Sequence, residues 1–299
     1  MVRAKLVGGL GNQLFIYAAA KALSEKNGST LVLDANGVGP GKTNHGVDIL
    51  PYVPISDDVT FSSSYSPCNQ FLRRTFLGLI HSKFTQGVLL TGHFFRSSEV
   101  GFDSQLLDQP SSVYVEGYFQ SWKYFKMLKD PEKLLNTKID FGSEWFTRLR
   151  HDILSATPVV IHVRRGDYLS EGNRFGCLGV KYYLAALDAL PSKFSDSEVW
   201  MFTDSPDDVG DLKYLLERRR VRVIRPPSNS HPMESLILMS QSKALVIGNS
   251  TFSFWAALLA GEKASVVAPA KWFKGMADPK DLLPETWARV TSYWTEPHE

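Results

Sequence analysis

The sequence is poor in cysteine, has no long apolar run and carries almost no net charge. Its two cysteines, Cys68 and Cys177, form no CxxC pair and no zinc-ligand spacing, so they indicate neither a disulfide framework nor a zinc site. No apolar run reaches the ~18–20 residues that a membrane-spanning helix needs. Lys and Arg together number 33 and Asp and Glu 31, so the overall charge gives no reason to expect nucleic acid as a partner.

Several motifs of catalysis and targeting are also missing. No HxxxH, HExxH or DxD pattern occurs, which gives a metal site little support, and the GxSxG signal of the α/β-hydrolases is absent. The first residues include no basic region followed by an apolar core, so we expect no signal peptide. These absences predict a cytoplasmic globular protein, and 299 residues are enough for two domains.

The N-terminal part of the chain predicts an α/β domain over residues 1–152. Alternating apolar residues predict a strand over 2–7, glycines predict a turn over 8–11, and helical spacing predicts a helix from Asn12 to Gly28. A buried strand over 30–34 and another over 113–118 follow. The remainder of residues 35–115 has no clear periodicity, and we interpret it as an inserted region of this domain.

The second half alternates strands and helices regularly. Predicted strands cover 158–163, 199–203, 221–224, 244–247 and 264–268, and predicted helices cover 181–190, 206–218, 233–242 and 251–260. Continuously apolar strands joined by helices are typical of a parallel sheet with right-handed crossovers. We therefore expect a second α/β domain over residues 153–299.

Polar residues follow the predicted strands of this second domain, where open parallel sheets bind their ligands. His162 and Arg164 share one face of their strand, and Arg164 and Arg165 could each hold phosphate oxygens in the two-point geometry of a guanidinium. Two alternatives stay open. Arg165 could form a surface ion pair, for example with Asp167, and His162 could be a buried structural histidine.

Two predicted helix N-termini add to this pattern. Ser250 is a good N-cap residue, and the N–H groups after it would form an anion site, although ordinary capping is the alternative. The frame Gly9-x-Gly11 lacks the third glycine of a dinucleotide motif, so that match is weak even with Asp34 after the next strand. The loop places Asn12 at a helix N-terminus; the alternative is a tight turn with an Asn cap.

Five segments resemble the α-1,2-fucosyltransferases of glycosyltransferase family 11, in the family's order and over nearly the whole chain. The most specific pair is HVRRGDY at 162–168 with NSTFSFW at 249–255, and the others are GGLGNQLF at 8–15, GYFQS at 117–121 and FTD at 202–204. The resemblance implies an α/β fold of two Rossmann-like domains facing a cleft, the GT-B type. It also implies that the N-terminal domain lies on the acceptor side and that the C-terminal domain binds GDP-fucose.

The activity that this resemblance implies is an inverting transfer of L-fucose to the 2-hydroxyl of a terminal galactose, without a metal or other cofactor. By this resemblance Arg164 would hold the diphosphate. For the acceptor proton the residues themselves offer Asp167, which could instead pair with an arginine, and less readily Glu171; the other alternative is a dissociative reaction that needs only a weak base, with Asn12 orienting the leaving phosphate. The residues expected to bind the donor are His162, Arg165, Asp204, Ser250, Thr251, Ser253 and Gly11. Arginine and helix N–H groups would stabilise the departing diphosphate, as a metal does in other enzymes.

The same resemblance implies a bacterial protein that acts in O-antigen or capsule assembly. The acceptor would be a galactose-terminated oligosaccharide or a lipid-linked glycan, reached by peripheral contact at the inner face of the membrane. Two other classes stay open: an NAD-dependent oxidoreductase that uses the first glycine loop, and a catalytically silent module that binds a nucleotide or a sugar.

Overall fold

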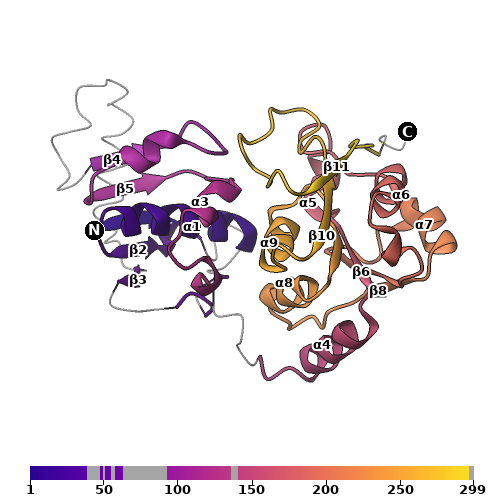
Figure 1. The fold of residues 1–299 in the computed structure, drawn as a ribbon. Helices are drawn as coiled ribbons and strands as arrows, with labels where there is room; N and C mark the ends of the chain where they lie inside the picture. The colour runs from indigo at the N-terminus through magenta and orange to yellow at the C-terminus, as the bar shows by residue number, and fades with distance from the viewer. Residues whose placement is uncertain (39–47, 50, 55–57, 63–92, 136–140, 296–299) are drawn as a thin grey trace. The chain divides into compact units, whose positions relative to one another are not determined.

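The computed structural model describes residues 1–38, 48–49, 51–54, 58–62, 93–135 and 141–295. The chain divides into two compact units, Met1–Asn136 with Pro279–Leu282, and Thr137–Asp278 with Leu283–Glu299. Each unit contains one parallel β-sheet and the helices that connect its strands (Figure 1). The α/β architecture expected from the sequence is therefore present in both.

The N-terminal unit has a five-stranded sheet with β1 at its centre, in the order β3-β2-β1-β5-β4. Helix α1 connects β1 to β2, and the short helix α3 follows β5. The bounds are β1 (Val2–Lys5), α1 (Leu10–Lys26), β2 (Leu31–Asp34), β3 (Val59–Ser62), β4 (His93–Arg96), β5 (Val113–Glu116) and α3 (Trp122–Lys126). Three 3₁₀ helices complete it: η1 (Ala35–Gly37), η2 (Ser104–Asp108) and η3 (Pro131–Lys133).

Helix α1 is buried on nearly all sides. Its residues from Leu14 to Ala20 are at most 1% exposed, because the helix contacts β1 and β2 as well as α3 and η2. The helix ends where the sequence predicts, with Asn27 as C-cap and Gly28 in the left-handed region at φ +57°. An apolar helix of this kind forms part of the unit's core.

A short segment from late in the sequence, Pro279–Leu282, belongs to the N-terminal unit; we call it the return segment. The N–H groups of Phe102 and Trp122 donate to the carbonyls of Lys280 and Leu282, and the Lys123 ammonium pairs with Asp281 at 2.8 Å. Nothing in the hydropathy pattern marks these four residues, because polar contacts, three of them to backbone carbonyls of the segment, hold it to the unit.

The C-terminal unit has a six-stranded parallel sheet in the order β11-β10-β9-β6-β7-β8. Its strands are β6 (Val159–Val163), β7 (Val199–Thr203), β8 (Val221–Ile224), β9 (Ala244–Val246), β10 (Ser265–Pro269) and β11 (Ala288–Val290). Its helices are α4 (Glu144–Ala156), α5 (Gly166–Ser170), α6 (Val180–Asp188), α7 (Lys213–Arg218), α8 (Pro232–Ser240) and α9 (Thr251–Leu259), with η4 (Ser192–Phe194) and η5 (Gly210–Leu212).

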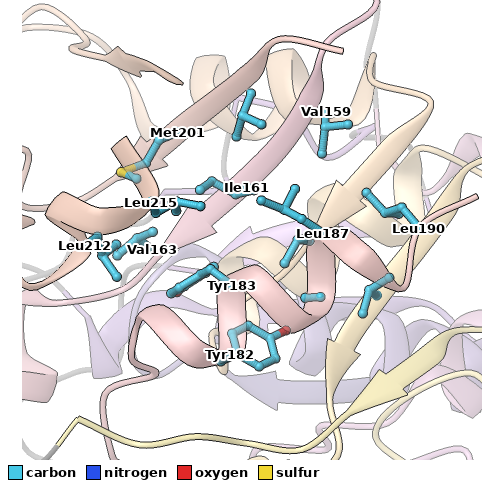
Figure 2. Packing of buried hydrophobic residues seen from close by; sticks show 14 of the residues in the cluster. Val159, Ile161, Val163, Tyr182, Tyr183, Leu187, Leu190, Met201, Leu212 and Leu215 are labelled. Carbon is cyan, nitrogen blue, oxygen red and sulfur yellow. The ribbon is translucent and has the colours of Figure 1, made fainter. Parts of the chain in front are cut away.

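The main core of this unit lies between the sheet and helices α6 and α7. Ile161 and Val163 of β6 share one cluster with Tyr183 of α6 and Leu212 of η5, all at most 1% exposed (Figure 2). Side chains on one face of β6, including Ile161 and Val163, thus lie in this core. The chain leaves the core after the carboxyl end of the strand. This packing holds the polar residues that follow β6 at a fixed place on the sheet edge.

The structure corrects the predicted helix over residues 206–218. Helix α7 begins only at Lys213, because Pro206 stands in a turn closed by a hydrogen bond from Asp208 N–H to the Ser205 carbonyl. Serine, proline and aspartate favour this turn over a helix start.

Several elements were absent from the sequence prediction. Besides the 3₁₀ helices, they are helices α3, α4 and α5 and the short strands β3, β4 and β11. Helix α4 carries its own signals, because Ser143 caps it by accepting from Phe146 N–H, and Leu149 and Ile153 continue the buried face. The domain boundary expected after residue 152 falls within α4, which belongs entirely to the C-terminal unit.

Two helix ends differ in how they reach the left-handed conformation, and this generates a prediction. Thr157 ends α4 at φ 44°, which is unfavourable for a β-branched residue, whereas Gly261 follows α9 at φ +79° with open space around a hypothetical Cβ. We expect Thr157→Gly to raise the unfolding free energy by about 0.5–1 kcal/mol and Gly261→Ala to lower it by about 1 kcal/mol. Urea unfolding followed by tryptophan fluorescence measures both, and a destabilised Thr157→Gly variant would contradict the assignment.

Candidate functional site

Three loops of the C-terminal unit meet at one edge of its sheet. Strands β9, β6 and β7 are direct neighbours and all parallel, so the residues that follow them emerge side by side. These residues are 164–168 after β6, 204–205 after β7 and 247–250 after β9. The sheet order thus brings together three of the segments that the sequence singled out.

Asp204 joins the loop after β7 to the loop after β6. Its Oδ1 accepts a hydrogen bond from the Arg165 backbone N–H at 2.9 Å, and its Oδ2 lies 2.8 Å from Arg164 Nη1. Gly166 makes this approach possible, since a Cβ there would lie 2.4 Å from Asp204 Oδ2 and its φ is +24°. A side chain at position 166 would therefore push the carboxylate away from both arginines.

Arg165 does not take the place expected of it. It is 1% exposed, its Nη2 lies 2.6 Å from Asp211 Oδ2, and its Nη1 donates to the carbonyls of Arg164 and Leu178. Asp211 and these two carbonyls occupy both terminal nitrogens of the guanidinium, so Arg165 is engaged by groups of the protein itself. Among the residues whose side chains the structure describes, its ion-pair partner is Asp211.

Arg164 is the arginine that stands at the edge. Its side chain is 25% exposed, and its guanidinium lies 5.5 Å from the centre of the Tyr168 ring while it pairs with Asp204. The Tyr168 hydroxyl in turn donates to the Asn249 carbonyl at 3.0 Å. Arg164 is thus held in one orientation by groups from two loops and remains in reach of solvent.

The first turn of α9 closes the third side of this edge. Ser250 is the N-cap and accepts from Phe252 N–H, while the Ser253 hydroxyl donates to the carbonyls of Gly248 and Ser250. Both side chains are at most 5% exposed, so they build the helix terminus, and Thr251 is partly exposed beside them. The first N–H groups of a helix have no acceptor within it, which makes this terminus suited to an anion.

His162 lies in β6 beneath the site and is neutral. Burial first, and then the nearby charge of Arg164, lower the pKa of His162 to about 3. Its ring lies 5.6 Å from that of Phe252, and within the described chain its buried Nδ1 has no hydrogen-bond partner. A buried nitrogen without a partner inside the protein is unusual and fits a group that meets a ligand.

The remaining predicted site residues are two in the N-terminal unit, Gly11 and Asn12, and one in the C-terminal unit, Asp167. Gly11 is buried and Asn12 partly buried in the first turn of α1, and Asn12 accepts a hydrogen bond from Gln120 at 2.9 Å. Their relation to the arginines stays a prediction. The backbone of Asp167 belongs to α5, but its side chain lies outside the described part of the structure.

Asp34 bears on the alternative of a dinucleotide site. Its side chain is 2% exposed and accepts from the Tyr114 hydroxyl and from the N–H and amide of Asn36. A carboxylate that binds a ribose must face the ligand, and this one is enclosed by protein donors. The glycine loop of the N-terminal unit therefore lacks two features of a dinucleotide motif, the third glycine and an available acid.

Two features that the described residues lack concern metals and membranes. Within that part of the chain, no three side chains of His, Cys, Asp or Glu come together in a way that could hold a metal ion. No helix described by the structure is both long and apolar enough to cross a bilayer.

Known structures of the same fold are glycosyltransferases. The fucosyltransferase NodZ from Bradyrhizobium aligns over 86% of this chain and 92% of its own, with 17% identity and a TM-score of 0.50. A NodZ alpha-1,6-fucosyltransferase crystal soaked with GDP-fucose gives the same TM-score at 16% identity, with 86% and 91% of the two chains covered. At these identities the likeness concerns the fold, which is an α/β fold of the GT-B type.

The family follows from the sequence model of glycosyl transferase family 11, which matches residues 90–287, about two thirds of the chain. The chain belongs to this family. It is 29% identical to an Escherichia coli alpha-1,2-colitosyltransferase over 97% of this chain and 99% of the relative. It is also 26% identical to the E. coli O-antigen biosynthesis glycosyltransferase WbnK, over 95% and 99%. The protein is thus a glycosyltransferase, and its family implies a nucleotide-sugar donor and a glycan acceptor.

The sequence did not indicate three residues that contact the candidate site residues. Asp211 follows Arg165 by 46 residues, and no spacing rule connects them. Tyr168 and Gln120 stand inside the quoted motifs, but the pattern alone did not indicate that one contacts Arg164 and the other Asn12.

The different surroundings of the two arginines predict different effects on stability. We expect Arg165→Met to lower the unfolding free energy by about 3–5 kcal/mol, because it leaves the Asp211 carboxylate without its buried partner. Arg225→Met is the matched control, since Arg225 pairs with Asp207 in the open, and it should cost under about 0.5 kcal/mol. Urea denaturation measures both, and equal losses would contradict the buried pair.

The neutral state of His162 predicts a pH dependence of stability. Because its folded pKa lies below the unfolded value of 6.5, the unfolded chain binds the extra proton as the pH falls from 7 towards 3. This one group should cost about 2 kcal/mol of unfolding free energy between pH 7 and pH 5. His162→Gln should remove that part of the dependence. Urea titrations at pH 7, 6 and 5 test it, and parallel curves for both proteins would show that His162 is not held neutral.

Proposed function

We propose that the protein transfers L-fucose from GDP-fucose to the 2-hydroxyl of a terminal galactose, with inversion and without a metal. The observation that carries this is Arg164, held at the sheet edge of a family 11 chain beside the N-terminus of α9. The acceptor that we propose is a glycan of the bacterial O-antigen or capsule type; the O-antigen is supported by the name of one relative, an O-antigen biosynthesis glycosyltransferase. A lipid-linked form of that glycan would bring the enzyme to the inner face of the membrane.

The charge that develops in the reaction matches the groups at this edge. As the bond between sugar C1 and the diphosphate oxygen breaks, negative charge grows on the diphosphate and positive charge on the sugar. The Arg164 guanidinium and the N-terminus of α9, with Thr251 in its first turn, would stabilise the departing diphosphate. Asp204 would keep Arg164 in position, and buried Arg165 would hold the loop rather than touch the phosphate.

The guanine base would meet His162 and Asp204. A neutral imidazole offers one donor and one acceptor, and the His162 Nδ1 has no partner within the described chain. Asp204 already accepts from both arginines, but a carboxylate has lone pairs for further donors such as the guanine N–H groups. This arrangement would select guanine over uracil.

The acceptor hydroxyl must lose a proton as it attacks sugar C1. Asp167 is the proposed group to receive it, because it stands two residues after Arg165 in the same loop and carries a carboxylate. Asn12 would orient the leaving phosphate from the N-terminal unit. The electron pair of the broken bond stays on the diphosphate, so no cofactor is needed.

A second donor deserves the same test, because one relative is named an alpha-1,2-colitosyltransferase. Colitose lacks the 3-hydroxyl of fucose, so one hydroxyl distinguishes the two sugars. A site that hydrogen-bonds that hydroxyl would reject colitose strongly, whereas an apolar site would discriminate far less.

To test the proposed function, the protein is incubated with GDP-fucose or GDP-colitose and a panel of β-galactosides in excess EDTA. We expect an α-1,2-linked product, identified by NMR, at the rate seen without EDTA, and stronger inhibition by GDP than by UDP. Transfer from GDP-colitose alone would show that the donor is GDP-colitose rather than GDP-fucose, and the proposed site would stand. A strict metal requirement would overturn the metal-free mechanism. Saturable NAD binding without GDP binding would indicate the oxidoreductase, and GDP binding without turnover the silent module.

Replacing Arg164 by lysine tests its role directly. Arg164→Lys keeps the positive charge but loses the two-point geometry, so kcat should fall by about 10²–10³-fold. The thermal midpoint should change little, because the side chain is partly exposed. Arg225→Lys, an exposed arginine in the same unit, is the control and should leave kcat unchanged. A destabilised Arg164→Lys variant with near-normal kcat would instead indicate a structural ion pair.

A further inference from the structure

Gln120 and Asn12 lie at the same edge of the N-terminal sheet, although 108 residues separate them. Asn12 stands in the first turn of α1, which follows β1, and Gln120 stands four residues after the end of β5. Strands β1 and β5 are parallel neighbours, so the two loops emerge together at their carboxyl ends. The unit thus repeats, at its own sheet edge, the arrangement found around Arg164.

One hydrogen bond determines which way the Asn12 amide faces. Gln120 Nε2 donates to Asn12 Oδ1 at 2.9 Å, so the carbonyl end of Asn12 is turned to Gln120 and the NH₂ end is turned away. The NH₂ end lies against Gly8, where a Cβ would come within 2.6 Å of Nδ2 and φ is +70°. Among the described residues, none accepts a hydrogen bond from Asn12 Nδ2.

Gln120 itself is held inward by an uncommon backbone. The preceding Phe119 has φ 52°, and its fully buried ring occupies the space where a Cβ of Gly117 would stand. A non-glycine residue in the left-handed region is costly, and such strain is frequent at functional sites. Gln120 is 6% exposed as a result, and its side chain reaches Asn12 rather than solvent.

The second polar atom of Gln120 shows that its place is not explained by stability alone. Within the described chain, Oε1 is buried without a hydrogen-bond partner. An unsatisfied buried acceptor destabilises a protein, and an apolar side chain of the same size would avoid that cost. The bond to Asn12 is the remaining feature that a leucine could not supply.

We propose that Gln120 is a positioning residue that holds the Asn12 amide with its NH₂ group towards an anionic oxygen of the substrate. The inference rests on the proposed function, in which Asn12 orients the leaving phosphate. The Asn12 NH₂ group and the N-terminus of α1 then both present positive charge at the same place. Without Gln120, the amide could rotate and present its carbonyl oxygen, which would repel the phosphate.

A double-mutant cycle on kcat tests whether Gln120 acts through Asn12. We expect Gln120→Leu to lower kcat by about 5–10-fold with an unchanged acceptor KM and a thermal midpoint no lower than that of the wild type, and Asn12→Ala to lower kcat at least as much. In the Asn12→Ala background, Gln120→Leu should have no further effect. An equal loss in both backgrounds would overturn the proposal. Gln105→Leu, an exposed glutamine of the same unit, is the control.

The variant Gln120→Glu gives a second readout. Its carboxylate cannot donate to Asn12 Oδ1 and would instead accept from Nδ2, turning the amide, so kcat at pH 8 should fall by about 10²-fold. The activity relative to wild type should recover as the pH falls towards 5, because the protonated carboxyl donates again. A ratio that stays constant with pH would overturn the proposal.

Failure of the proposed function and failure of this inference are distinguishable. If the wild-type protein transfers no sugar from GDP-fucose or GDP-colitose, the function fails while the positioning role can still be tested. A crystal structure of Gln120→Leu at high resolution then decides it. A rotated or disordered Asn12 amide supports the role, and an Asn12 side chain unchanged from wild type overturns it.

Discussion

The C-terminal site depends on the carboxylate of Asp204. One oxygen binds the backbone after β6 and the other binds the Arg164 guanidinium, so one side chain sets the course of the loop and the direction of its exposed arginine. The contact requires glycine at position 166, because any side chain there would occupy the same space as the carboxylate. The contacts of the Asp204 carboxylate therefore depend on Gly166, which stands 38 positions earlier in the chain.

Burial gives the two adjacent arginines different roles. Arg165 is enclosed and paired with Asp211, so its charge is neutralised inside the protein, where an unpaired charge would be destabilising. Arg164 is partly exposed and shares its charge with Asp204 in a setting that water reaches. Arg164 is therefore more accessible to a ligand than Arg165, which is why the proposed function assigns the diphosphate to Arg164.

The two units apply the same principle to different chemistry. In each unit a helix follows a central strand, β1 or β6. A side chain that follows the neighbouring strand then contacts a polar side chain between that central strand and the first turn of the helix. Asp204 does this for Arg164 with a charged pair, and Gln120 does it for Asn12 with a neutral hydrogen bond. Both use strained or glycine backbone to bring the orienting side chain close, at Gly166 and at Phe119.

The sequence by itself determined the α/β class, the family and most of the regular elements. Apolar runs and helical spacing located β6, β7, β8, α6, α8 and α9 to within two residues, since those patterns arise from burial on a sheet or one helix face. It missed β3, β4 and β11, which are short and lie at or near sheet edges, and it extended α7 across a turn that Pro206 and its neighbours form. Short edge strands depend on pairing more than on their own composition.

Tertiary structure alone decided which candidate residues are buried and which remain exposed at the sheet edge. Arg164 and Arg165 are identical in type and adjacent, so no pattern of residue types could distinguish them; Asp211, 46 residues further on, made one of them structural. In the same way, the pairing of β1 with β5 placed Gln120 beside Asn12 across 108 residues. Local sequence determines backbone conformation, whereas the partner of a charged or amide group is determined by the order of the strands, which brings distant segments to one edge.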